Sequence, residues 1–236
     1  MIAGNILIYN TVSLVISRSK SISIKTIQTN SKSIIIYDNM SYIESSNGIR
    51  LNNHVRSITK PTLIQLYKII GHLLGDGTLE MCKTSKNPRF CFTQTFKRFE
   101  YVWSVYKSIS NLCQKLPSQS KGLRKEKYFY SLAIHTRSYP FLMSLYDMFY
   151  PLMNGHRIKI VPDDLIYFFN PISLACFAMD DGAKVKKSGF YFHTKGFTFT
   201  DVYKLAGMMH YVFGYTVTVQ NHENRPVIYI PSKHLF

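Results

Sequence analysis

Acidic residues that could bind a metal ion stand at the ends of two similar apolar runs. The first run, IIGHLLGDG, ends around Asp76, and the second, LACFAMDDG, ends at Asp180 and Asp181. Both runs predict buried helices. An acid at the C-terminal end of a helix lies beside the negative end of the helix dipole, which costs about 0.3–1 kcal/mol. A lone Asp-Gly pair would indicate a turn, but this repeated placement indicates a cation that offsets the charge of both acids.

Each run also shows where its helix begins and what it packs against. Pro61 suits the first turn of the first helix, and Asn170-Pro171 gives the second helix an N-cap residue followed by proline. Gly71 and Gly75 lie one turn apart on one face, so they allow a second helix backbone to come close. We therefore expect the two helices to pack together. The residues expected at their interface are Gly71, Gly75, Cys176 and Ala178.

The rest of the chain repeats one order of elements: helix ending in Asp, basic link, strand, helix, strand. Alternating side chains predict strands at residues 89–96, 128–136 and 190–194, and a hairpin of residues 215–219 and 227–230. Helical spacing predicts helices at residues 97–116, 139–150 and 198–212. The sequence therefore predicts an α/β protein of the α+β type, with two related units at residues 61–155 and 156–236.

The chain is strongly basic, which restricts its partners. Its 236 residues include 29 Lys and Arg against 13 Asp and Glu, a net charge of +16. Self-repulsion of this kind opposes folding, so the excess points to a polyanion: DNA, RNA or an anionic membrane. No apolar run approaches the ~20 residues that span a bilayer, so we expect no membrane partner. The basic links contain five candidates for phosphate contacts: Lys83, Lys86, Lys184, Lys186 and Lys187.

The four cysteines carry no signature of a metal site or of a disulfide framework. Cys82, Cys91, Cys113 and Cys176 contain no CxxC pair. Reduced, buried thiols are therefore expected.

Residues 1–60 predict an extension of low order. The segment is rich in Ile and Ser and has no acidic residue before Asp38. This composition fits a mitochondrial transit peptide, and it fits equally well an unfolded segment read through from upstream sequence. Abundant Ile, Asn, Lys, Tyr and Phe, all with AT-rich codons, indicate a mitochondrion or another organelle.

Several motifs resemble one family in detail. IIGHLLGDGTLE, RFCFTQTFKRFEYV, KIVPDDL, NPISLACFAMDDGAK and SGFYFHTKGFTFTDV together resemble the LAGLIDADG homing endonucleases of the monomeric, two-repeat type, a group that includes organellar intron maturases. The resemblance covers residues 63–230. It implies a pseudo-twofold pair of αββαββα repeats whose two antiparallel sheets form a saddle on double-stranded DNA. The chain is expected to end before the last helix of the second repeat.

The resemblance also assigns roles by position. It makes Asp76 and Asp181 the catalytic acids that bind Mg²⁺, with the carbonyls of Gly75 and Asp180 as further ligands and the Asp180 side chain as a secondary candidate. It makes Lys159 an assisting lysine at the active site. The DNA-reading residues that it suggests are Arg89, Cys91, Thr93 and Thr95 in the first sheet and His193 and Lys195 in the second.

The implied function is site-specific hydrolysis of both DNA strands with magnesium, by an intron-encoded endonuclease. Two alternatives stay open at this point. The first is a maturase that binds intron RNA on the same fold and helps it splice. The second is a decayed relative without activity, which the short second repeat would favour. Cys176 is a further departure, because an aromatic residue is common at this position in the family.

Overall fold

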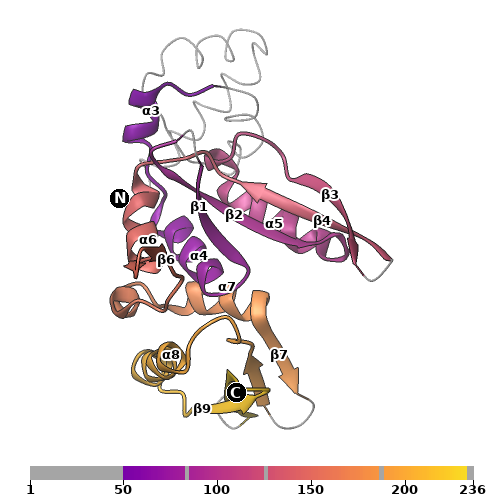
Figure 1. The fold of residues 1–236 in the computed structure, drawn as a ribbon, viewed down its shortest axis with the longest axis vertical. Helices are drawn as coiled ribbons and strands as arrows, with labels where there is room; N and C mark the ends of the chain where they lie inside the picture. The colour runs from indigo at the N-terminus through magenta and orange to yellow at the C-terminus, as the bar shows by residue number, and fades with distance from the viewer. Residues whose placement is uncertain (1–49, 83–84, 125–126, 186–188, 233–236) are drawn as a thin grey trace, which may run out of the picture. The chain divides into compact units, whose positions relative to one another are not determined.

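Figure 1 shows the computed structural model of the chain, in which residues 50–82, 85–124, 127–185 and 189–232 are described. These described residues all belong to one compact unit. Three predicted phosphate contacts, Lys83, Lys186 and Lys187, lie outside the described residues, as does the extension up to residue 49.

The first half follows the order helix, two strands, helix, two strands, helix. Its elements are α4 (Leu63–Leu74), β1 (Gly77–Met81), β2 (Pro88–Thr95), α5 (Phe99–Ile109), β3 (Ser118–Arg124), β4 (Lys127–His135) and α6 (Phe141–Phe149). The strands form an antiparallel sheet in the order β1-β2-β4-β3. One face of this sheet carries Leu79, Phe90, Phe92, Leu132 and Ile134, all buried in the core. The α5 and α6 helices contact the sheet, so we call the other side its polar face.

The second half repeats this plan. Its elements are α7 (Pro171–Asp181), β7 (Gly182–Val185), β8 (Gly189–Phe192), α8 (Phe199–Phe213), β9 (Thr218–His222) and β10 (Arg225–Pro231). The strand order β7-β8-β10-β9 matches that of the first sheet. The predicted α+β class with two antiparallel sheets is therefore confirmed. The short elements of the described chain are α3 (Asn53–Ile58), η2 (Phe96–Arg98), η3 (Ser110–Leu112), η4 (Asp163–Tyr167), β5 (Leu152–Met153) and β6 (His156–Arg157).

The two central helices begin at similar side-chain caps. Asn170 caps α7 as predicted, and Ser173 completes a capping box with it. The prediction for α4 was wrong in detail: Pro61 lies outside the helix. Thr62 is the N-cap, and it forms a capping box with Gln65. The motif Thr-x-x-Gln was the available sequence signal.

Three strands of the two four-stranded sheets were missed, and each lies at the edge of its sheet. They are β1, β3 and β7, which the sequence presented as polar or basic links. An edge strand has only one neighbour and often carries charged residues, so its sequence lacks the apolar alternation of β2 and β4. Hydrogen bonds to the adjacent strand, rather than hydrophobic pattern, fix its conformation.

Low order up to Lys60 does not hold for the described part of that segment. Residues 53–58 form α3, whose N-cap Asn52 accepts a hydrogen bond from the backbone of Val55 at 2.8 Å. The helix is also anchored at a distance, because Arg56 donates two hydrogen bonds to the Ser138 carbonyl. Among the described helices, none has the length and apolarity that a membrane crossing requires.

Candidate active site

The α4 and α7 helices pack directly against each other (Figure 1). A Cβ atom on Gly71 would overlap the Ser173 carbonyl oxygen and lie 2.7 Å from Cys176 Cβ. A Cβ atom on Gly75 would overlap Asp180 Cβ and lie 2.7 Å from its Oδ2. The two backbones can approach this closely only because glycine occupies both positions. We call these contacts the helix interface.

Asp76 and Asp181 come from the two helices and influence each other electrostatically. The α4 helix ends just before Asp76, whereas α7 includes Asp181. Burial and the charge of Asp180 raise the pKa of Asp76. Burial and the charges of Asp76 and Asp180 raise the pKa of Asp181 to about 7. Two partly buried carboxylates that repel each other form a donor set of hard oxygen atoms, which suits a divalent cation such as Mg²⁺.

The Asp180 side chain belongs to a separate, buried network. Its Oδ2 atom accepts hydrogen bonds from His72 Nδ1 at 2.9 Å and from the Asp76 backbone at 3.3 Å. Its Oδ1 atom accepts one from the Tyr101 hydroxyl at 2.5 Å. These three donors, rather than a metal ion, satisfy the carboxylate. Asp180 is also the neighbour of Gly75 at the helix interface, whereas Ala178, which was expected there, packs against the hydrophobic core.

His72 makes this network ionic. Burial lowers the pKa of His72, but the hydrogen bond and charge of Asp180, together with Cys176, outweigh it and raise the pKa to about 9. The imidazolium and the Asp180 carboxylate therefore form a buried ion pair between α4 and α7 at neutral pH. Phe92 lies against the His72 ring, with centroids 4.9 Å apart. Sequence reasoning missed this pair, although a histidine within an apolar helix was a signal.

Lys159 interacts electrostatically with both acids, and its assisting role at the active site stays a prediction. Its ammonium group donates to the carbonyl oxygens of Gly77 at 2.9 Å and Gly75 at 3.4 Å, on either side of Asp76. Burial lowers the pKa of Lys159 to about 8, although the charges of Asp181, Asp76 and Asp180 favour its protonated form. The Gly75 carbonyl, expected as a metal ligand, is thus an acceptor for this lysine.

Two further residues contact the acidic centre and were not predicted as site residues. The Gln94 side chain donates a hydrogen bond to Asp76 Oδ2. A glutamine among the core-facing residues of β2 was the signal for this contact. Arg98 donates to the Met179 carbonyl at 3.2 Å. Its positive charge offsets part of the rise in the pKa of Asp76 and of Asp181.

On the polar face of the first sheet, the predicted DNA-reading residues differ in their exposure to solvent. Thr93 and Thr95 are exposed, and Arg89 is partly exposed and paired with Glu80 at 2.8 Å. Lys86 is exposed in the β1–β2 connection. Cys91 differs from these, because it is 3% exposed. Neighbouring side chains cover its thiol, so it is poorly placed to read DNA.

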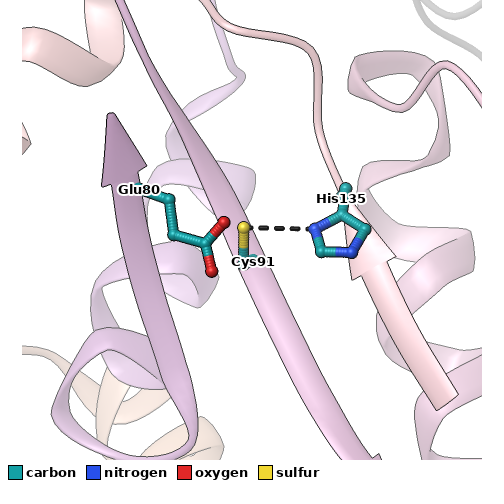
Figure 2. Close-up of side chains that lie close together, drawn as sticks. All are labelled: Glu80, Cys91 and His135. Carbon is teal, nitrogen blue, oxygen red and sulfur yellow. Dashed lines mark hydrogen bonds between the residues drawn. The ribbon is translucent and has the colours of Figure 1, made fainter. Parts of the chain in front are cut away.

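Figure 2 shows the cluster that surrounds Cys91. The side chains of Glu80 on β1, Cys91 on β2 and His135 on β4 converge, with ligand atoms within 4.8 Å of one another. Such a trio has the donor types of a zinc site. However, burial and the Glu80 carboxylate raise the pKa of the thiol, which favours its protonated form, and Glu80 is bound by Arg89. A hydrogen-bonded cluster, with His135 Nδ1 at 3.2 Å from Cys91 Sγ, accounts for these contacts.

On the second sheet, the predicted basic residues lie at its margins. Lys184 pairs with Phe190 and therefore shares that residue's face, while His193 is exposed just after β8. Lys195 forms an ion pair with Glu223 at 2.7 Å. The face opposite Phe190 instead carries a polar and aromatic group that sequence reasoning missed because strand register determines it. Its members are Tyr191, Gln220, His222 and Tyr229.

Comparison with known proteins identifies the family. A sequence model of the LAGLIDADG DNA endonuclease family matches residues 66–235, most of the chain. The chain belongs to this family. The two acids of the LAGLIDADG motifs thus come from one polypeptide, which agrees with a monomer.

The chain resembles both maturases and endonucleases. It is 32% identical over 197 residues to the cytochrome b mRNA maturase bI2 of Saccharomyces cerevisiae, a match that covers 80% of this chain and 46% of the relative. The chain thus spans about half the length of that relative. It is 25% identical to the probable intron-encoded endonuclease 1 of Wickerhamomyces canadensis, over 79% of this chain and 82% of the relative. A similar solved fold is the homing endonuclease I-WcaI bound to its DNA recognition sequence, with a TM-score of 0.69, 23% identity, and coverage of 84% and 89%.

Proposed function

We propose that the protein is a site-specific endonuclease that hydrolyses both strands of double-stranded DNA with Mg²⁺. One observation carries this proposal: Asp76 and Asp181 stand at the ends of the two packed helices α4 and α7, where the charge of Asp76 acts on Asp181. Lys159 donates to the carbonyls on either side of Asp76. The two repeats, residues 61–155 and 156–236, would each supply one acid and one sheet. The metal would be held by these two carboxylates, with the carbonyl of Asp180 as an additional ligand, because the Gly75 carbonyl accepts a hydrogen bond from Lys159.

The bound metal would act as a Lewis acid and lower the pKa of a water molecule. The protein's own residues then have defined tasks. Gln94 orients the Asp76 carboxylate through its hydrogen bond. Lys159, whose pKa is lowered to about 8, supplies positive charge where charge develops on the phosphate. The ion pair of His72 and Asp180 keeps the two helices in register, and with them the two acids.

The sheets would bind the DNA. The net charge of +16 favours a polyanion in general, whereas sequence is read by side chains that reach base edges. In the first sheet Arg89, Thr93 and Thr95 are the proposed readers. In the second sheet we add Tyr191 and Gln220 to the earlier candidate His193, because they project from the sheet's polar side.

The direct test is a cleavage assay on a duplex that carries the intron-less host allele. With Mg²⁺ we expect cuts in both strands at one position, and with EDTA we expect binding without cleavage. A duplex of the same composition and scrambled sequence is the control. A cooperatively folded preparation that leaves the target intact in Mg²⁺ would contradict the proposal.

A second candidate function is assistance in intron splicing. The observation that favours it is the 32% identity to a protein named as a cytochrome b mRNA maturase. That similarity, with the AT-rich residue usage, also supports an origin in a mitochondrion or another organelle. Tight binding of the host intron RNA, with faster splicing and no DNA cleavage, would make this the principal function.

A further inference from the structure

A polar cavity of about 380 Å³ lies at one end of the first sheet. It is lined by residues before and within α3, by the β1–β2 connection, by Gln114 and by the segment after β4. Four of the lining residues are arginines: Arg50, Arg56, Arg89 and Arg137. In the part of the chain that the structure describes, no Asp or Glu lines the cavity.

Neutral carbonyl groups fix two of these arginines in place. Arg56 donates to the Ser138 carbonyl from Nε at 3.1 Å and from Nη2 at 2.5 Å. Arg137 is 7% exposed and donates from Nη1 to the Cys113 carbonyl at 2.9 Å. A carbonyl oxygen orients the Arg56 guanidinium group but does not cancel its charge. Both groups are therefore ordered in advance of any ligand, which lowers the entropic cost of binding.

The other two arginines are Arg89, which lies on β2 of the first sheet, and Arg50, which is exposed to solvent. Arg89 bonds Glu80, whose side chain is 47% exposed, so this pair is readily screened by water and salt. Arg89 also shares the polar face of the first sheet with Thr93 and Thr95. Arg50 is exposed at the start of the described chain. The cavity thus borders the face that is proposed to contact DNA.

We propose that this arginine cavity binds a phosphate group of the DNA backbone, at the flank of the duplex that lies over the first sheet. The planar guanidinium fork matches phosphate oxygens in pairs, and the two non-bridging oxygen atoms of a phosphodiester present such a pair. The polar lining does not suit an apolar ligand. A phosphodiester fits best among anions, because the cavity borders the polar face. This inference rests on the proposed DNA binding.

The test compares the full-length protein with Arg50→Gln and with Lys107→Gln as the control. Lys107 is an exposed lysine on α5, away from the polar face, and its substitution removes the same charge. The affinity for the host-allele duplex is measured in EDTA over a range of salt concentrations. Losing one phosphate contact should reduce the slope of log affinity against log salt by about one. We expect this shift for Arg50→Gln and an unchanged slope for Lys107→Gln.

A second variant and a second probe keep the outcome decisive. Arg56→Gln should shift the slope in the same way, and its melting temperature reveals any disturbance of α3. Inorganic phosphate should raise the melting temperature of the parent above that in chloride at equal ionic strength, and less so for Arg50→Gln. Equal slopes for Arg50→Gln and Lys107→Gln on a duplex that binds well would overturn the proposal. An effect on intron RNA but not on DNA would also overturn it. A parent that binds no duplex would instead refute the proposed function, and the phosphate measurement would then decide whether the cavity holds an anion.

Discussion

Asp181→Asn should stabilise the metal-free protein. The ionised carboxylate of Asp181 is partly buried and lies near two other acids, which raises its pKa from 3.8 to about 7. A tenfold change in the acid dissociation constant corresponds to about 1.36 kcal/mol, so the ionised form costs at most about 4 kcal/mol of folding free energy. That pKa already includes the attraction to Lys159. Because the side chain is only partly buried, solvent screening reduces the gain, and we expect a net stabilisation of about 2 kcal/mol. For a chain of this size that raises the melting temperature by about 4–8 °C.

The effect should depend on pH with a defined sign. Because folding raises the pKa of Asp181, the folded state binds the proton more tightly than the unfolded state. Below about pH 4 the carboxyl is protonated in both states, so the folded parent does not bear the cost of a buried ionised carboxylate and its stability is highest. This stability is lost as the pH rises towards 7, where the Asp181 carboxyl of the folded state ionises. The stability gap between variant and parent should therefore open between pH 4 and 7 and persist above that range.

The assay is thermal or urea unfolding in EDTA at several pH values. Asp164→Asn is the matched control, because Asp164 is an exposed aspartate and its substitution should change stability little at any pH. Millimolar Mg²⁺ should stabilise the parent more than Asp181→Asn and so narrow the gap. A gap of equal size at pH 4 and pH 8, or a variant that is less stable at pH 8, would refute the electrostatic reasoning.

Three further predictions follow from the helix interface and its surroundings. Gly71→Ala should destabilise the protein by about 1–3 kcal/mol in urea unfolding, because its Cβ meets the opposing helix backbone. Gly207→Ala on the open face of α8 should instead add about 0.5–1 kcal/mol, and equal effects of both changes would contradict the close packing. Tyr101→Phe removes a donor to buried Asp180 and should cost about 1–3 kcal/mol, which an unchanged urea midpoint would exclude. Lys159→Met should lower the single-turnover cleavage rate at least tenfold while duplex affinity, measured in EDTA, stays within about threefold; parent-like cleavage would remove Lys159 from the chemistry.

The sequence predicted those features that repeat or that bury one face. The doubled motif around Asp76 and Asp181 located the central helices, and the apolar alternation in β2, β4 and β8 located the inner strands. Asn170 gave the start of α7 because a capping residue acts on its own helix. Each of these signals is either local or present twice, so it can be recognised in a single sequence without knowledge of the packing.

The remainder depends on contacts between distant residues. The Asp180 carboxylate was predicted as a secondary candidate for a metal ligand. Its actual partners, His72 and Tyr101, are distant in sequence, so the sequence did not reveal them. Cys91 alternates with exposed threonines along β2, yet it is covered by residues from β1 and β4. The edge strands β1, β3 and β7 take their conformation from a neighbouring strand. Each of these features requires the sheet register and the packing of the helices, which spacing along the chain does not define.

The central claim is that one acid from each LAGLIDADG helix forms a single metal-dependent centre for cutting DNA. The most direct measurement compares the parent, Asp76→Asn, Asp181→Asn and the control Asp164→Asn on the intron-less host allele in Mg²⁺, with duplex affinity measured in parallel. The account predicts that the parent and the control cut both strands, whereas each of the other two variants binds the duplex and cuts neither strand at a comparable rate. Cleavage at the parent rate by Asp76→Asn or by Asp181→Asn would contradict it.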